Sequence, residues 1–235
     1  MKSRPILFSA PMVRALLAGT KTQTRRVVKP QPIFSAAAGD SWEWHGGSAL
    51  MKAGYGAPYV HTNRGHVVKA MTTICPYGKP GDLLWVRERA AFYWNDWHYF
   101  ADGPTAWGKD VSDKTFSRPS IHMPRAASRL TLRITDVRVE RLQEISEEDA
   151  RAEGILHVGK TVNETDMWAQ FGAIEKTSAG LCADVRYVGR TAVKAYERLW
   201  ESINGCDSWA ANPWCWCLTF DVIKQNVDTV LKAAA

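Results

Sequence analysis

The chain has 235 residues, of which 46% are hydrophobic and 23% are charged. This length allows one domain with a substantial core or two small ones, and the composition is that of a soluble globular protein. A formal net charge of +6 is mildly basic, which is compatible with phosphate-bearing partners but does not by itself indicate them. The eleven tryptophans indicate either an aromatic-rich core or flat surfaces on which nucleic-acid bases stack.

The cysteines and the first residues argue against several classes of protein, namely zinc-binding, disulfide-bonded, secreted and membrane-spanning ones. The five cysteines are odd in number and form no Cys-x-x-Cys pair, and Cys215 and Cys217 are too close together for a zinc-binding arm. We therefore expect reduced thiols, no metal site and no cofactor. The first residues lack the apolar core of a signal peptide, and no apolar run reaches membrane-spanning length. We expect a cytoplasmic protein with no membrane partner; the oligomeric state is not indicated.

The chain opens with a predicted strand at 4–8 and a predicted short helix at 9–18. Ser9 suits the N-cap and Pro11 falls in the tolerant first turn. Gly19 follows at the position where helices end in the left-handed conformation. The apolar residues of this helix share one face: Met12, Val13, Leu16 and Leu17.

Residues 19–26 bring together an amine, three hydroxyls and two guanidinia. A helix places side chains three positions apart on one face, whereas a strand places them on opposite faces. Lys21 and Thr24 therefore converge only if the chain forms a turn or a helix end here. A functional site is one interpretation; the other is that Lys21 compensates the dipole at the helix C-terminus.

Three long segments lack a regular pattern and are predicted as insertions: 30–74, 95–128 and 156–189. The first contains isolated aromatic residues: Trp42, Trp44, Tyr55 and Tyr59. The second ends near His122 and Arg125, which lie in a loop before a strand. Both are candidates for substrate binding, but a structural or solvated role is the alternative.

Residues 83–88 form a predicted strand that ends in Arg87 and Glu88. We interpret these two as an internal ion-pair element or, alternatively, as residues that line a pocket. Adjacent strand residues face opposite sides, so at most one of them faces the same way as Trp85, which we expect in the core.

Residues 130–134 alternate as a strand, and the apolar phase then shifts by one at Val137 and Val139. A bulge near 135–136 accounts for this shift, and barrels use bulges to turn corners. A helix at 146–154 follows, with Ser146 as N-cap, carboxylates in its first turn and Gly154 at its end. Glu153 stands at the C-terminal end, where the helix dipole disfavours a negative charge, so a nearby cation or a functional role is expected; a solvated surface position is the alternative.

The last elements are clearly patterned. Residues 192–204 form an amphipathic helix whose predicted apolar face contains Val193, Tyr196, Trp200 and Ile203. Residues 214–222 alternate as a strand of a half-buried sheet, with Trp216 in the core, and the tail from Lys224 is either a weak helix or disordered. The sequence thus predicts an α+β fold in a single domain at 1–224, followed by a tail at 225–235.

Several of these segments resemble one family. Residues 6–27 resemble the opening of ASCH (activating signal cointegrator homology) domains, whose mark is Gly-x-Lys-Thr-x-Thr-x-Arg or a close variant. Lys21, Thr22 and Thr24 match this mark, Arg26 fits its last position, and Arg25 is an additional guanidinium. Further matches are Pro80–Val86, Leu142–Ile155 and Asn212–Val222. The long loops, with Cys75–Asp82 and His122–Arg125, are most similar to the ASCH proteins of phages and prophages.

The resemblance implies a PUA-like fold, which is a small, mostly antiparallel pseudo-barrel with flanking helices and, here, long loop insertions. It also implies an activity, because some small bacterial members are amidohydrolases that cleave N4-acetylcytidine to cytidine and acetate with a Lys, a Thr and a downstream Glu. Matched by motif, these residues are Lys21, Thr24 and Glu153, the last through Ile145-Ser-Glu-x-x-Ala-x-x-Glu153. No metal or cofactor is implied.

Amide cleavage needs an activated nucleophile, stabilisation of charge on the carbonyl oxygen and a proton for the leaving amine. In the expected mechanism Lys21, with a pKa lowered by burial and by Arg25 or Arg26, acts as a base towards Thr24 or a water. Glu153 orients Lys21 or carries the proton to N4. Residues expected to bind a modified cytosine nucleoside or RNA are Thr22, Arg25, Arg26, Arg87, Glu88, His122 and Arg125.

The alternative function is an RNA- or nucleotide-binding module without catalysis, as in many PUA-like domains. Loop tryptophans then stack on bases. The cations expected to hold phosphate in that case are Lys21, Arg25, Arg26, Arg125 and Arg129. A third possibility is a phage accessory or counter-defence protein that acts on modified nucleotides or on a host partner.

Overall fold

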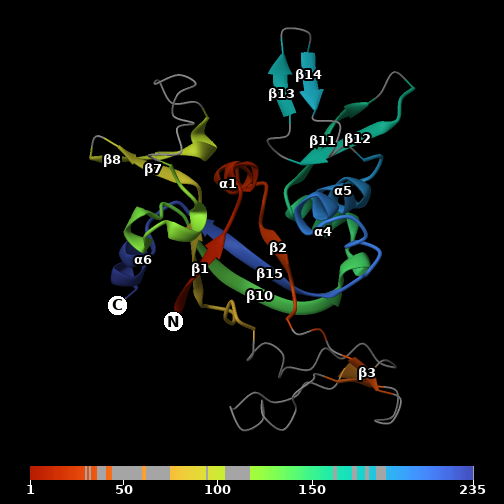
Figure 1. The fold of residues 1–235 in the computed structure, drawn as a ribbon, viewed down its shortest axis with the longest axis horizontal. Helices are drawn as coiled ribbons and strands as arrows, with labels where there is room; N and C mark the ends of the chain where they lie inside the picture. Colours follow the sequence, from red (N-terminus) through yellow and green to blue (C-terminus); the bar gives the residue numbers. More distant parts are fainter. Residues whose placement is uncertain are drawn as a thin grey trace.

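A computed structural model describes residues 1–29, 31, 33–35, 41–43, 60–61, 75–93, 95–103, 117–160, 163–170, 174–177, 180–183 and 189–234. They form an α+β fold around one curved five-stranded sheet, as predicted (Figure 1). Of the aromatic residues in the first insertion, Trp44, Tyr55 and Tyr59 lie outside the described residues. None of the described helices has both the length and the apolar character needed to span a membrane.

The central sheet has the strand order β1-β6-β10-β15-β2. These strands are β1 (Ser3–Leu7), β6 (Leu83–Arg87), β10 (Thr131–Arg141), β15 (Trp214–Ile223) and β2 (Gln23–Val27). β1 and β6 run parallel, and the other neighbours run antiparallel. The predicted strands at 4–8, 83–88 and 214–222 are confirmed within one or two residues.

Helix α1 (Ala10–Leu17) connects the two edge strands of this sheet, β1 and β2 (Figure 1). Arg26 on β2 donates from Nη2 to the Leu7 carbonyl at the end of β1, at 2.6 Å. The sheet therefore curves until its edges approach each other. Among the described strands β1 and β2 have no backbone pairing with each other, so a closed barrel is not formed.

Helix α1 follows the sequence prediction. Ser9 occupies the N-cap, although its side chain makes no capping hydrogen bond, and Val13 and Leu16 are buried against the sheet. Gly19 has φ 75°, the left-handed conformation that glycine adopts at little cost. This turn sends the chain back towards β2.

Strands β10 and β15 form the centre of the sheet. Their pairing shifts between Ile134 and Asp136, which confirms the predicted bulge. β15 packs its even-numbered residues, including Trp216, against α1 and the inner core, while Cys215 packs against the second core on the opposite face. The first half of this strand is therefore buried on both faces, which corrects the prediction of a half-buried strand.

Helices α4 (Glu147–Ala152) and α5 (Ala192–Asn204) cover the second face of the sheet. Ser146 caps α4 by accepting from Asp149 N at 3.0 Å. On α5 the predicted apolar face is buried at Tyr196 and Trp200, whereas Ile203 on the same face is 56% exposed. The reason is that Ile203 lies one turn beyond the core, at the rim of a pocket.

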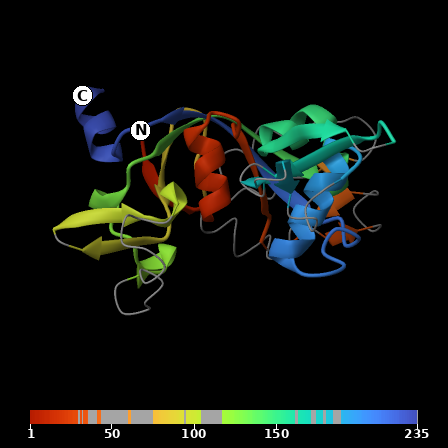
Figure 2. The ribbon, with the colours of Figure 1, turned by 90° about the horizontal axis from the view of Figure 1, so that it is seen from above.

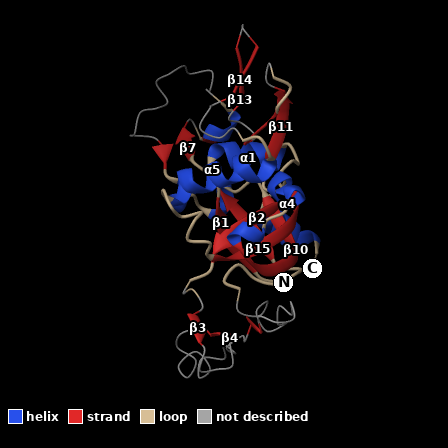
Figure 3. Ribbon diagram, turned by 90° about the vertical axis from the view of Figure 1, so that its right-hand side faces the viewer, coloured by secondary structure: helices blue, strands red, loops and turns tan. Residues whose placement is uncertain are grey.

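The predicted insertions contain short hairpins. They are built from β3 (Ile33–Ser35), β4 (Ser41–Glu43) and β5 (Val60–His61), from β7 (Ala90–Tyr93), β8 (Asp96–Tyr99) and β9 (Ser117–Arg118), and from β11 (Ile155–Lys160), β12 (Asp166–Gln170), β13 (Ile174–Thr177) and β14 (Gly180–Ala183). Figure 3 shows β3 and β4 at one end of the molecule and β13 and β14 at the other. The segment 156–189, predicted as a long insertion without a regular pattern, contains strands that its pattern does not reveal, because short two-stranded ribbons leave little periodicity in a sequence.

The C-terminal tail is the helix α6 (Val227–Ala233), with Asn226 as its N-cap. Val227 and Val230 pack on Trp85 of β6, so the helix alternative is confirmed. The chain ends lie on the same side of the molecule (Figure 2). Four 3-10 turns complete the described elements: η2 (Phe100–Asp102), η4 (Ser120–His122), η5 (Arg125–Ala127) and η6 (Leu142–Glu144).

Asp82 joins the start of β1 to the turn that precedes β6. Its Oδ1 accepts from Lys2 N at 2.8 Å, and its Oδ2 accepts from Lys79 N and from Arg4 Nη1, each at 3.3 Å. Burial by itself raises the pKa of this carboxyl, but the donors outweigh burial and hold the pKa below its ordinary value. The ionised carboxylate therefore stabilises the fold.

We expect Asp82→Asn to lower the free energy of unfolding by about 1–3 kcal/mol at pH 7, because charged acceptors make the stronger bonds. The native state binds fewer protons than the unfolded chain, so the wild-type advantage is complete above the ordinary pKa of 3.8 and is lost as the pH falls through the lower native value. Urea unfolding of the wild type and of Asp82→Asn at pH 7 and pH 3 measures this difference in stability. A difference that stays constant between these pH values contradicts the assignment.

Candidate active site

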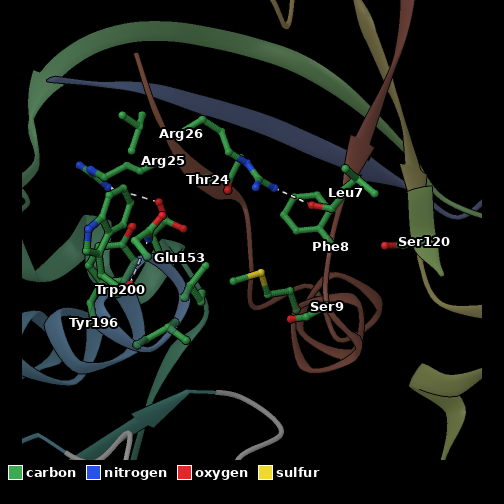
Figure 4. A pocket seen from close by; sticks show the side chains of 15 residues that line it. Leu7, Phe8, Ser9, Thr24, Arg25, Arg26, Ser120, Glu153, Tyr196 and Trp200 are labelled. Carbon is green, nitrogen blue, oxygen red and sulfur yellow. Dashed lines mark hydrogen bonds and ion pairs between the residues drawn. The ribbon is translucent and has the colours of Figure 1, made fainter. Parts of the chain in front are cut away.

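The described residues enclose a pocket of about 320 Å³ where the edges of the sheet approach each other (Figure 4). One side comes from the end of β1 and the start of α1, the other from α5, and β2 lies between them. Its lining residues are Leu7, Phe8, Ser9, Met12, Thr24, Arg25, Arg26, Val27, Ser120, Glu153, Tyr196, Leu199, Trp200, Ile203 and Asn204. This volume is at the lower end of the range for small-molecule sites.

Lys21 and Glu153 form a buried ion pair beside this pocket. Lys21 Nζ lies 2.7 Å from Glu153 Oε2 and donates to the Glu153 carbonyl at 2.8 Å. Their backbones also form an isolated β-bridge, so two residues that are 132 positions apart in the sequence are in direct contact. The side chains are 1% and 4% exposed, respectively. The cation expected near Glu153 is therefore present.

Local turns bring the two residues together. After Gly19, Lys21 N donates to the Ala15 carbonyl at 3.2 Å, which turns the chain towards α4. On the other side Gly154 has φ 96°, and a Cβ there would meet the Ala15 Cβ at 3.3 Å. Glycine at this position permits both the left-handed backbone and the close approach of α1.

Burial lowers the pKa of Lys21 from its ordinary value. Glu153 acts in the opposite direction, while the positive charges of Arg26 and Arg25 lower the pKa further. The direction agrees with the expectation from sequence, which named burial and the two arginines as causes. A lysine in such surroundings releases its proton more readily than an exposed one.

Lys21 does not line the pocket, whereas Glu153 does. Within the described residues Glu153 Oε1 has no hydrogen-bond partner; its nearest ion-pair partner is Arg25 Nη1 at 3.6 Å. Lys21 thus holds one carboxylate oxygen, and the second oxygen keeps its lone pairs available. Any ligand in the pocket meets Glu153 before it meets Lys21.

Arg25 is fully buried in a cluster of carboxylates. Its Nη2 donates to Asp149 Oδ2 at 2.8 Å and to Glu140 Oε2 at 3.1 Å. The Gln23 amide is oriented so that its oxygen accepts from Arg25 Nη1 at 2.6 Å and its nitrogen donates to Asp149 Oδ1 at 3.0 Å. Burial by itself lowers the pKa of this guanidinium, but Cys217 and the facing carboxylates raise it above its ordinary value. Arg25 therefore stays charged and is bound by protein groups.

Residues 22–26 are divided between two faces, because β2 begins at Gln23. Thr24 and Arg26 lie on one face of β2, and their partners on the neighbouring strand β15 are Leu218 and Trp216. Arg25 points to the other face of β2. The prediction of a turn or helix end therefore holds for Lys21 but not for Thr24. Thr24, Arg25 and Arg26 all line the pocket, and exposed Thr22 does not.

Besides Thr22, four predicted binding residues lie outside the pocket lining. Arg87 donates to the Met123 carbonyl at 3.1 Å, and Arg125 contacts Ser3 and Asp228. His122 is exposed on η4. Buried Glu88 accepts from Arg129 at 2.8 Å, so the ion-pair interpretation holds for Glu88 with Arg129 as its partner rather than Arg87.

Sequence reasoning missed the aromatic wall of the pocket. Tyr196 and Trp200 on α5 line it, with ring centroids 6.2 Å apart, and Phe8 stands opposite beneath Arg26. The available signal was the apolar face of the predicted helix 192–204, which is typical of core packing. Periodicity does not distinguish a residue buried in the core from one buried at a pocket wall.

The described residues contain no group of three or more His, Cys, Asp or Glu side chains able to hold a metal ion. Comparisons with protein-family models, with curated proteins and with solved structures find no match for this chain. Functional inference therefore depends on the side chains and on their geometry.

Proposed function

We propose that the protein is a metal-independent amidohydrolase that cleaves N4-acetylated cytosine nucleosides, converting N4-acetylcytidine to cytidine and acetate. The observation that carries this proposal is the buried Lys21–Glu153 pair beside Thr24 at the pocket. These are the three residues that the resemblance to ASCH amidohydrolases assigns to catalysis. The ion pair is independent of that resemblance, because a contact between residues so far apart is not encoded in a local motif.

A PUA-like fold is part of the same proposal. The sheet is mixed and strongly curved, helices flank it, and Arg26 connects its two edges through Leu7. Such an arrangement is compatible with an open pseudo-barrel whose pocket lies where the edges meet.

In the proposed mechanism Glu153 is the proton carrier. Its Oε1 takes a proton from a water that attacks the acyl carbon, while the Thr24 hydroxyl holds that water. Lys21 remains behind Glu153 and fixes Oε2. When the carbon–nitrogen bond breaks, Glu153 returns the proton to N4, and acetate and cytidine leave. The charge that develops on the acyl oxygen needs a hydrogen-bond donor as well.

The binding-module alternative has less support. It assigns phosphate contacts to five cations, of which four have carboxylate partners: Lys21, Arg25, Arg125 and Arg129. Arg26 donates to the Leu7 carbonyl and lies over Phe8. Binding of RNA through such a surface would weaken steeply with salt, whereas turnover of a neutral nucleoside would not.

The proposal is tested by incubating the purified protein with N4-acetylcytidine and following cytidine by chromatography, with and without EDTA. We expect turnover in both. Thr24→Val is expected to lower kcat about 100-fold through a misplaced water, and Thr24→Ser is expected to retain most activity. No turnover by the wild type, or full turnover by Thr24→Val, counts against the proposal.

A further inference from the structure

We propose that Tyr196 is a further catalytic residue, whose hydroxyl donates a hydrogen bond to the acyl oxygen of the substrate as the tetrahedral intermediate forms. This role rests on the proposed amide hydrolysis. It supplies the donor that the mechanism still requires, because a developing oxyanion is stabilised best by a preorganised partner.

The first argument is placement. Tyr196 lies on α5, is 4% exposed and lines the pocket together with Thr24 and Glu153 (Figure 4). Its ring packs against Trp200 at 6.2 Å and against Trp209 at 6.3 Å between centroids. These contacts with two indole rings restrict the orientation of the phenol, and an oxyanion donor must be preorganised in this way.

The second argument is that the terminal donor nitrogens of the neighbouring cations already have acceptors, although Arg25 Nε and Arg26 Nε have none among the described residues. Lys21 Nζ donates twice to Glu153, Arg25 Nη2 donates to two carboxylates, and Arg26 Nη2 donates to a backbone carbonyl. None of these bonds involves the Tyr196 hydroxyl. The indole nitrogen of Trp200 belongs to the same wall and has no hydrogen-bond partner among the described residues. Tyr196 is therefore one of two donors in this wall with capacity for a ligand, and it is the one that carries a hydroxyl.

The third argument is protonation. Burial raises the pKa of Tyr196 well above its ordinary value, and the nearby Glu153 carboxylate raises it further, with Arg25 acting in the opposite direction. The phenol therefore keeps its proton at neutral pH. A donor that must not ionise is suited to hydrogen bonding rather than to proton transfer.

In the proposed step the water oxygen forms a bond to the acyl carbon, the carbonyl electron pair moves onto the acyl oxygen, and one water proton moves to Glu153. The negative acyl oxygen accepts the hydrogen bond from Tyr196. As the carbonyl re-forms, the bond to N4 breaks and N4 takes the proton from Glu153. The acetic acid that leaves gives its remaining proton to solvent and becomes acetate. Tyr196 keeps its proton throughout.

The test is Tyr196→Phe, which keeps the ring and removes only the hydroxyl. With N4-acetylcytidine we expect kcat to fall about 100-fold or more, with KM within about twofold of the wild type, because the bond forms in the transition state. Tyr99→Phe is the matched control, since the Tyr99 hydroxyl donates to the Ala127 carbonyl at 2.8 Å away from the pocket. The control is expected to leave both constants unchanged.

Circular dichroism and thermal unfolding of both variants establish that they are folded. Wild-type turnover together with unchanged kcat in Tyr196→Phe overturns the role of Tyr196 and leaves the proposed function standing. A raised KM at unchanged kcat also overturns it, since the hydroxyl then binds the ground state equally well. Absence of wild-type turnover overturns the proposed function and this role with it.

Discussion

Lys21→Met is expected to lower the free energy of unfolding by about 3–5 kcal/mol, because it removes the closer of the two cations that face the buried Glu153 carboxylate and leaves only Arg25 at 3.6 Å. Both side chains of the pair are almost completely enclosed, and the nitrogen–oxygen distance is 2.7 Å. Burial of a charge is costly, and removing one partner exposes that cost. Chemical unfolding followed by circular dichroism measures the change.

The double variant Lys21→Met/Glu153→Gln is expected to recover a large part of this loss, since it leaves no unpaired charge. Lys194→Met is the matched control. It removes an ion pair of similar length, 2.6 Å to Glu197, in which the lysine is 64% exposed. Such a surface pair is worth about 0.2–1 kcal/mol. Equal losses in Lys21→Met and Lys194→Met would contradict the importance of burial.

Glu153→Gln is expected to reduce kcat for N4-acetylcytidine by about 10²–10⁴-fold, because an amide neither accepts the proton of water nor returns it to N4. The substitution preserves shape, so substrate binding is expected to change less than turnover. Rates are compared at a temperature at which circular dichroism shows both proteins to be folded. This precaution separates chemistry from the loss of the ion pair.

Glu148→Gln is the control for this variant. Glu148 lies on the same helix, α4, but is exposed and does not line the pocket. We expect its kcat to equal that of the wild type. If Glu153→Gln keeps more than about a tenth of the activity, general acid–base catalysis by Glu153 is ruled out.

Lys21 and Glu153 illustrate how much of the site the sequence alone could predict. The C-terminal position of Glu153 on a short helix predicted a cation nearby, since the helix dipole disfavours a carboxylate there. Which cation it meets was given only by the resemblance to a family. The bond between Lys21 and Glu153 crosses 132 positions, and no local pattern encodes a contact of that range.

Arg25 illustrates what a local pattern does not show. Alternation along β2 turns the side chains of Arg25 and Arg26 to opposite faces. Both residues line the pocket, but the Arg25 guanidinium is also bound by the carboxylates of Glu140 and Asp149. These partners lie 115 and 124 positions away, and no local pattern encodes contacts of that range.

The sequence by itself determined the elements with strong periodicity: α1, the bulged strand β10, the helix α5 and the strand β15. Their apolar spacing, caps and glycine ends act over a few residues, so the sequence contains all the required information. Only packing between distant segments determines that the sheet curves until Arg26 reaches Leu7, and that Tyr196, a member of the second core, also lines a pocket. Such outcomes depend on packing between segments distant in sequence, and the free energy of that packing is not written in any single segment.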